Sequence, residues 1–329
     1  NYIGFVIIAA AGGYFAIKGY VSIGVISAFI VYAKQFGRPI DELANIWGQI
    51  QTAIAGAERV FAVLDEPSED KSGEFTMDNS TGNIEFNHVD FSYIPGKQVL
   101  HDFNLKVKAG QKVALVGSTG SGKTTVVNLL MRFYDIDNGS ITIDGVNIKD
   151  VSQRDLRSKI GFVPQKGMLF TGTIRSNIKY GNPSMSDEDM IKAATIAQAT
   201  EFIESKPKKY DEEISQGGTN VSGGQRQRLS IARAIATDPE IFVFDDSFSA
   251  LDLKTDSKLR AALKEKTENK TVIIIAQRIS TILDADKIIV LEEGKIAGIG
   301  KHEELMKNCE IYKQIALSQL SKEELENGK

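Results

Sequence analysis

Apolar residues follow different patterns along the chain, and the first pattern is two uncharged runs. Residues 2–17 and 21–33 contain no charged side chain and are separated by Lys18 and Gly19. Each run is shorter than the roughly 20 apolar residues of a membrane-spanning helix, so two short buried helices are one interpretation. We favour the end of one membrane helix, a short outside turn and a second, returning helix. Lys34 and Arg38 then lie on the cytoplasmic side, as the positive-inside rule expects.

From residue 35 to residue 64 the pattern becomes that of an amphipathic helix, which would carry the second membrane helix into the cytoplasm. Its apolar positions recur at intervals of three and four residues: Ile40, Leu43, Ile46, Trp47, Ile50, Ile54, Ala57 and Phe61. We expect Pro39 to bend this helix. The polar, glycine-containing sequence after it predicts a linker over residues 67–82. Because the chain opens inside an apolar run without Met, we expect residues 1–66 to be the end of a longer transmembrane domain.

A different pattern begins at residue 83 and predicts a second domain over residues 83–320, followed by a polar tail over 321–329. Alternating apolar and polar positions over 84–93 and 103–107 predict half-buried strands. Short apolar runs bounded by polar residues predict buried strands at 113–116, 241–244, 272–275 and 288–291. Residues 173–236 have a helical pattern. We therefore predict an α/β domain with a mostly parallel core sheet, an antiparallel β flap and a helical subdomain.

Composition excludes several classes of function. The chain has 329 residues, a net charge of −4 and no long run of Lys or Arg, which argues against nucleic acid as a partner. Its one cysteine, Cys309, excludes an internal disulfide and suits a reducing compartment. The three histidines, His88, His101 and His302, are scattered, so neither a zinc cluster nor a Ser-His-Asp triad is expected.

The segment from Gly117 to Thr124 has the pattern Gly-x-x-x-x-Gly-Lys-Thr between a predicted strand and a helix-prone run. This is the context that a phosphate-binding P-loop requires. The glycines let backbone N–H groups point at a polyphosphate, and the helix N-terminus adds its positive dipole end. We expect Lys123 to reach the terminal phosphates and the Thr124 hydroxyl to ligate Mg²⁺. The predicted phosphate-binding residues are Gly117, Ser118, Thr119, Gly120, Ser121, Gly122, Lys123, Thr124 and Thr125.

A pair of carboxylates follows the apolar run at residues 241–244. A buried strand of an α/β sheet delivers the acids at its carboxyl end to the crevice where ligands bind. We therefore expect Asp245 to hold Mg²⁺ through water and Asp246 to orient the attacking water.

A second candidate anion site lies at Val221-Ser222-Gly223-Gly224-Gln225, just before a helix-prone segment. Ser222 is placed as an N-cap, and the two glycines leave backbone N–H groups open to an anion. The segment resembles the Leu-Ser-Gly-Gly-Gln signature of ATP-binding-cassette (ABC) proteins, with Val in place of the leading Leu. Three further segments resemble motifs of that family in the same order. They are Tyr93, like the aromatic residue that stacks on adenine; Gln165, like the Q-loop glutamine that touches Mg²⁺; and Ser249–Asp252, like the D-loop that crosses the dimer interface.

The resemblance covers residues 83–319 and, with the apolar segment in front, is to the C-terminal part of an ABC exporter half-transporter. It implies ATP and Mg²⁺ as cofactors and a multi-pass protein of a bacterial cytoplasmic membrane with its ATP-binding domain in the cytoplasm. Membrane lipid, a hydrophobic small-molecule substrate and a second half-transporter are the implied partners. In this family each ATP lies between one P-loop and the signature of the other chain. The residues that would serve a partner's ATP are Ser222, Gly223, Gly224, Gln225 and Asp252.

Two residues depart from the family pattern. The residue after the Mg²⁺-binding Asp is usually a catalytic Glu, and Asp246 is shorter by one C–C bond, roughly 1.5 Å. A misplacement of roughly 1 Å in a catalytic group can cost on the order of 10²-fold in rate. The switch-loop histidine is replaced by Gln277, which forms hydrogen bonds but carries no positive charge. We predict that Asp246, Gln277, Lys123 and Gln165 form a site that binds ATP but hydrolyses it slowly.

These departures, together with the unusual segment 215–218, resemble the degenerate-site subunit of heterodimeric bacterial multidrug exporters, whose partner has the intact Glu. A homodimeric exporter of lipids or peptides with a slow Asp base is the first alternative. The second is a non-transport ABC protein that acts on nucleic acid or ribosomes. The segment between Gly117 and Ser222 has room for a helical subdomain but not for the coiled coil of DNA-repair types. Ribosome-acting types have two cassettes and no membrane span.

Overall fold

The structure is a computed structural model that describes residues 2–68, 73, 75–78 and 80–319, in two units, residues 1–70 and 71–329. The first unit consists of two helices, α1 (Tyr2–Ile17) and α2 (Ile23–Leu64). Helix α2 continues through Pro39, and most of its apolar side chains are exposed. Among the described residues, no helix combines the length and the apolar character needed to cross a membrane. The predicted spans therefore stay a prediction, and the predicted polar tail at 321–329 lies outside the described residues.

The second unit is built around a six-stranded sheet with the strand order β12-β11-β3-β10-β9-β6. Its strands are β3 (Lys112–Gly117), β6 (Ile160–Val163), β9 (Ile241–Asp245), β10 (Thr271–Ile275), β11 (Lys287–Glu292) and β12 (Lys295–Gly300). All neighbours pair in parallel except β12, which is antiparallel to β11. These pairings confirm the predicted, mostly parallel core. The sequence could predict it because strands covered on both faces have continuous apolar sequences.

The β flap is a separate antiparallel sheet with the order β2-β1-β4-β5. Its strands are β1 (Ile84–Ile94), β2 (Lys97–Val107), β4 (Asn138–Ile143) and β5 (Val146–Asn147). Alternate residues of β1 and β2 are buried, and the rings of Phe86 and Phe103 meet edge to face at 5.3 Å. The alternation in the sequence therefore predicted this sheet correctly.

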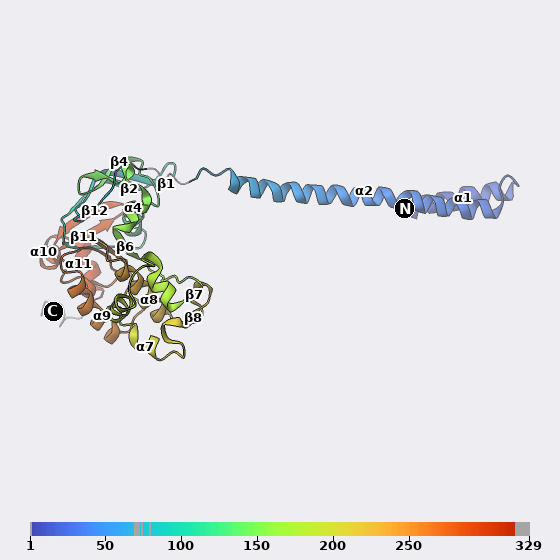
Figure 1. The fold of residues 1–329 in the computed structure, drawn as a ribbon. Coiled ribbons are helices and arrows are strands. Elements are labelled where there is room, and N and C mark those ends of the chain that lie inside the picture. Colours follow the sequence, from blue (N-terminus) through green and yellow to red (C-terminus); the bar gives the residue numbers. More distant parts are fainter. Residues whose placement is uncertain (1, 69–72, 74, 79, 320–329) are drawn as a thin grey trace. The chain divides into compact units, whose positions relative to one another are not determined.

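Helices cover the sheets and form the end of the second unit that lies farthest from β4 (Figure 1). The longer helices are α3 (Lys123–Leu130), α6 (Asp187–Ile196), α8 (Gly223–Ala236), α9 (Leu253–Lys266), α10 (His302–Asn308) and α11 (Glu310–Leu317). The shorter elements are α4 (Gln153–Ser158), α5 (Ile174–Ile178), α7 (Thr200–Glu204), β7 (Gly172–Thr173) and β8 (Glu213–Ile214). Ser186 caps α6 by accepting a hydrogen bond from Asp189 N.

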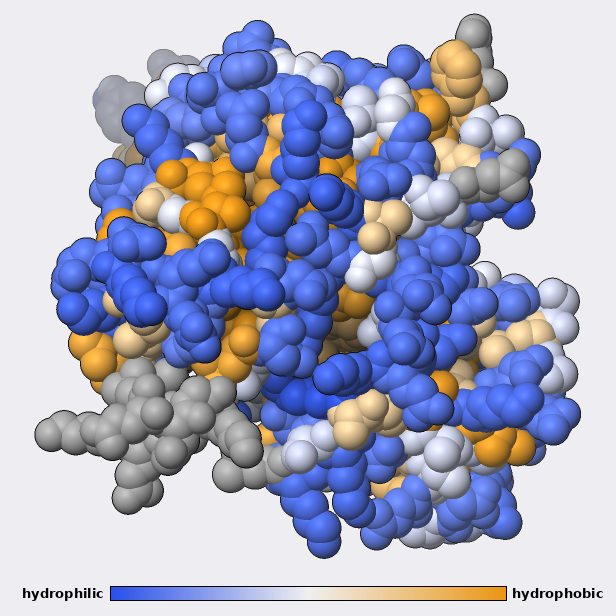
Figure 2. All heavy atoms as spheres, turned by 90° about the vertical axis from the view of Figure 1, so that its left-hand side faces the viewer, coloured by the Kyte–Doolittle hydropathy of each residue, from blue (hydrophilic) through white to orange (hydrophobic). Residues whose placement is uncertain are grey.

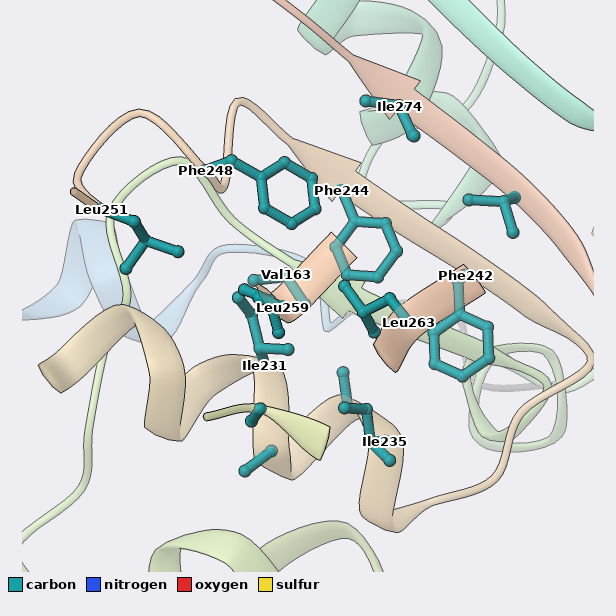
Figure 3. Packing of buried hydrophobic residues seen from close by; sticks show 14 of the residues in the cluster. Val163, Ile231, Ile235, Phe242, Phe244, Phe248, Leu251, Leu259, Leu263 and Ile274 are labelled. Atoms are coloured by element: carbon teal, nitrogen blue, oxygen red, sulfur yellow. The ribbon is translucent and has the colours of Figure 1, made fainter. Parts of the chain in front are cut away.

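Two apolar clusters lie on opposite faces of the core sheet. Successive residues of β10 illustrate this, because Ile274 belongs to one cluster and Ile273 and Ile275 belong to the other. Figure 3 shows part of the first cluster, in which Phe244 of β9 packs beside Phe248 from the segment that follows the strand. The face of the second unit drawn in Figure 2 is largely hydrophilic, with scattered apolar patches. Because an apolar cluster packs against each of its faces, the core sheet is held rigidly, and this fixes the loops at its edge.

Candidate nucleotide-binding site

The strand order brings three functional segments to one edge of the core sheet. Strand β10 pairs with β3 on one side and with β9 on the other, so that Ile275 lies between Leu115 and Asp245. The P-loop follows β3, the acidic pair ends β9, and Gln277 follows β10. Because parallel strands present their carboxyl ends at the same edge, the predicted residues meet there although they are far apart in the sequence.

The P-loop between β3 and α3 depends on glycines with positive φ angles. Gly117, Gly120 and Gly122 have φ angles of 150°, 83° and 104°, which L side chains rarely adopt. A Cβ atom on Gly117 would also collide with the carbonyl oxygen of Leu291, and one on Gly122 would lie 2.9 Å from Leu100 Cδ2. Both the curl of the loop and its packing against β11 and β2 therefore require glycine.

The Lys123 ammonium is bonded to the backbone of this loop. Its Nζ donates hydrogen bonds to Gly117 O at 2.9 Å and to Ser118 O at 2.7 Å. Burial lowers the pKa of Lys123, and the nearby Asp245 and Asp246 carboxylates act in the opposite direction. The cation is thus held where a bound phosphate would replace the two carbonyl oxygens as its partner.

Thr124 and Asp245 provide a pair of oxygen ligands that fits Mg²⁺. The Thr124 hydroxyl donates to Asp245 Oδ2 at 3.2 Å, and Asp245 is 6% exposed. Burial raises the pKa of Asp245, and the adjacent Asp246 raises it further. Within the described ranges, no group of three or more His, Cys, Asp or Glu side chains could hold a metal ion. A Mg²⁺ ion at these two oxygens would therefore complete its octahedral shell with phosphate oxygens and water.

Asp246 stands at the centre of the site in an unusual backbone conformation. It is 8% exposed, its φ angle is +45°, and its N–H donates to Ile275 O at 2.9 Å. Asp tolerates this left-handed region better than most residues. Its Oδ2 atom accepts a hydrogen bond from Gln165 Nε2 at 3.2 Å. A small cavity is lined by Asp246 and Gln277 together, so the structure brings both departures from the family pattern to one place.

The Q-loop is held by residues that the sequence analysis missed. Ser247 Oγ donates to Val163 O at 2.8 Å, at the end of β6. The buried Gln227 amide of α8 accepts from Gly167 N at 2.8 Å and donates to Pro164 O at 3.1 Å. These bonds fix the backbone on both sides of Gln165. No signal in the sequence distinguished Gln227 from its polar neighbours in α8.

Tyr93 lies beside the start of α3 with 43% of its surface exposed. Its hydroxyl donates to Thr125 Oγ1 at 3.2 Å and accepts from Asn128 Nδ2 at 3.2 Å. Its ring makes edge-to-face contacts with Phe91 at 4.7 Å and Tyr134 at 4.9 Å. The side chain is therefore tied to the helix that follows the P-loop, and its stacking on adenine stays a prediction. Asn128 and Tyr134 are further members of this group that the sequence did not reveal.

The signature segment caps α8. Gln225 N donates to Ser222 Oγ at 3.2 Å, and Ser222 N donates to Gln225 Oε1 at 3.1 Å, which confirms the predicted N-cap. A Cβ atom on Gly224 would lie 3.3 Å from Ala250 O, so the signature lies against the D-loop. Asp252 caps α9 by accepting from Thr255 N at 2.9 Å, and its contact with a nucleotide stays a prediction. Within this chain the signature and the D-loop lie together. The hydrogen bonds of Ser222, Gln225 and Asp252 given above all join residues three positions apart.

The fold and the site together define a class of protein. A P-loop next to a buried acidic pair on a parallel core sheet, with a β flap and a helical part, is a P-loop nucleotide-binding domain. Residues 100–249 match the family model described as ABC transporter. The chain contains an ABC transporter ATP-binding domain, a domain that hydrolyses ATP.

Related proteins align with nearly the whole chain, including residues outside the range that the family model matches. The chain is 45% identical over 324 residues to an uncharacterised ABC transporter ATP-binding protein of Bacillus subtilis, covering 98% of this chain and 54% of the relative. It is 43% identical over 313 residues to a fatty acid ABC transporter ATP-binding/permease protein of Mycobacterium bovis, covering 95% and 50%. It is 41% identical over 312 residues to a putative multidrug export ATP-binding/permease protein of Bacillus subtilis, covering 94% and 54%.

Among solved structures, a bacterial Atm1-family ABC exporter with ATP bound has a TM-score of 0.75 and 34% sequence identity. The similarity covers 92% of this chain and 54% of that chain. The chain thus spans about half the length of the curated relatives and of the solved exporter that it matches.

Proposed function

We propose that this chain is part of one half of an ABC exporter of a bacterial cytoplasmic membrane and acts as a heterodimer with a second, different half-transporter. In this proposal residues 1–66 belong to the transmembrane domain, residues 67–82 are a linker, and residues 83–320 are the cytoplasmic ATP-binding domain. The long helix α2 would carry motion from that domain to the membrane. ATP binding closes the two domains, and hydrolysis at the site that contains the partner's P-loop opens them again.

The observation that carries the proposal of a slow ATP site is the meeting of Asp246 and Gln277 at one cavity, and the heterodimer is proposed from it together with the resemblance. A base must lie within hydrogen-bond reach of the proton it takes. The Asp246 carboxylate accepts a hydrogen bond from Gln165, and the Asp side chain is shorter than that of Glu by roughly 1.5 Å. Gln277 can donate a hydrogen bond to the γ-phosphate but cannot become cationic as charge develops there. Near the γ-phosphate, the Asp246 base is thus shorter than the usual Glu, and Gln277 lacks the positive charge that a His can carry. We therefore propose that this site binds Mg·ATP and hydrolyses it slowly.

The other residues of the site retain what ATP binding needs. When it is bound, Mg²⁺ supplies positive charge at the β- and γ-phosphates, with Thr124 and Asp245 as its protein ligands. Lys123 orients the phosphates, Tyr93 stacks on adenine, and Gln165 joins the Q-loop to the acidic pair. The capped signature around Ser222 is nearly intact, with Val221 in place of the leading Leu, so in this proposal it serves the ATP held by the partner's P-loop.

The proposed cargo is a hydrophobic compound of the multidrug type. One relative is named as a putative multidrug export protein and another as a fatty acid transporter, and a fatty acid is an amphiphilic compound. The name of the fatty acid transporter fits the cargo of the alternative, a homodimeric lipid exporter in which both sites use Asp246 as a slow base. The two possibilities differ in partner, so the composition of the native complex separates them.

Isolation of the native complex through a tag on this chain is the first test. A second half-transporter of different sequence that has a Glu at the catalytic position supports the proposal. A complex made of this chain alone would establish the homodimer instead.

A gain-of-function experiment tests the slow site itself. In a complex whose partner has lost its own catalytic base, Asp246→Glu with Gln277→His should raise ATP hydrolysis well above the parent. Either single change should help little, because groups that act as a unit are not additive. If the double variant stays at the parent's level, these two residues do not limit the site.

A further inference from the structure

The switch loop that contains Gln277 is joined to the C-terminal helices through one side chain, that of Gln319. The Gln319 Nε2 atom donates to the carbonyl oxygen of Gln277 at 2.8 Å. Its Oε1 atom accepts from the N–H of Ile279 at 2.9 Å. One amide therefore holds the two peptide groups on either side of Arg278, as a neighbouring strand would.

The ends of the loop are held by other elements. On one side, Ala276 N donates to Leu115 O of β3 at 3.2 Å. On the other side, Arg260 of α9 donates from Nη1 to Thr281 O at 2.9 Å. Between these anchors lies Gln277, which is exposed and faces the cavity that it shares with Asp246. At this point the two bonds from Gln319 hold the exposed backbone on either side of Arg278, in addition to the buried Ile279 side chain.

Gln319 is held in place by the end of helix α11. It lies just past α11, where its own N–H donates to Ala316 O at 3.1 Å. Tyr312 and Ala316 of α11 are fully buried and belong to the same apolar cluster as Ile279. The helix and the buried side of the loop thus share one core, and the Gln319 amide connects their exposed sides.

We propose that Gln319 is a positioning residue for the ATP site: its amide fixes the switch-loop backbone and thereby places Gln277 over the γ-phosphate. The inference rests on the proposed function in one respect, namely that Gln277 faces ATP bound at this chain's P-loop. It also gives the C-terminal helices a direct mechanical connection to the catalytic edge of the sheet, which the motifs of the ATP site do not provide.

Hydrogen exchange in the complete transporter tests the proposal, with the nucleotide-free protein as the first condition. Gln319→Ala removes both bonds and should speed exchange in the peptide covering residues 277–282 at least about fivefold. Gln319→Glu keeps the acceptor for Ile279 but loses the donor for Gln277, so its exchange should lie between those of the parent and the Ala variant. Ser318→Ala is the matched control, because among the described residues Ser318 Oγ bonds only locally, to Ile315 O at 2.7 Å.

Three results would overturn the proposal. The first is parental exchange of the loop in Gln319→Ala. The second is an equal rise in the peptides of α10 and α11, which would show that the residue merely holds the helix end. The third is a Glu variant that exchanges as fast as the Ala variant.

The second condition adds Mg·ATPγS and separates this proposal from the proposed function. The parent should gain protection over residues 277–282, and Gln319→Ala should lose most of that gain while unfolding at the parental temperature. If the parent gains no protection, the assignment of Gln277 to the γ-phosphate is wrong, whereas the nucleotide-free comparison still decides the role of Gln319. If both proteins gain equally, Gln319 does not position Gln277.

Discussion

Replacement of Lys123 by Ala should weaken ATP binding to this chain's P-loop about 10³-fold. Without nucleotide, the Lys123 ammonium donates to two neutral carbonyl oxygens, at 2.9 and 2.7 Å. Binding exchanges these partners for anionic phosphate oxygens. A unit charge pair about 4 Å apart near a protein surface contributes about 4 kcal/mol. A net loss of about 4 kcal/mol corresponds to roughly 10³-fold in affinity.

The assay is photo-crosslinking with labelled azido-ATP at increasing nucleotide concentration, read on this chain after separation from its partner. Lys149→Ala is the matched control, because Lys149 is exposed and its loss changes the net charge equally. The control should label like the parent, and both variants should keep the parental circular dichroism. A loss of less than tenfold for Lys123→Ala, or a loss equal to that of the control, would refute the role of this ammonium.

Three further predictions follow from the same contacts. Tyr93→Ala should weaken ATP binding by about 1–3 kcal/mol, the contribution of one aromatic–base stack, whereas Tyr93→Trp should bind like the parent in the same labelling assay. Ser222→Ala should lower steady-state turnover of the complex more than Asp246→Ala does, because Ser222 serves the partner's site, and the opposite ranking would reverse the assigned roles. Asp144 accepts hydrogen bonds from residues 80–83. Although burial acts to raise its pKa, these bonds hold the pKa of Asp144 well below the usual range. The carboxylate should therefore stabilise the second unit fully above about pH 4 and progressively less below it, a dependence that Asp144→Asn should lose in urea unfolding.

Hydrophobic periodicity predicted most of the second unit because burial imposes a different pattern on each kind of strand. The alternation at residues 84–93 gave β1, and the continuous runs at 113–116 and 241–244 gave β3 and β9. The short strand β6 at Ile160–Val163 was missed, because four residues with a glycine among them give little pattern. In the first unit the same reasoning predicted two helices, and both are present.

The residues of the ATP site divide in the same way. The sequence by itself determined the P-loop, the acidic pair, the signature cap and the two departures at Asp246 and Gln277, because each depends on residue types at fixed local spacing. The resemblance predicted that Asp246 and Gln277 belong to one site, but only the tertiary structure decided how they meet, at a cavity that follows from the order of strands β3, β10 and β9. It also decided the supporting roles of Gln227 and Gln319, whose side-chain amides bond to loops 60 and 42 residues away in the sequence. A glutamine on a helix surface carries no local mark of such a role, because its partners are backbone groups that only folding brings near.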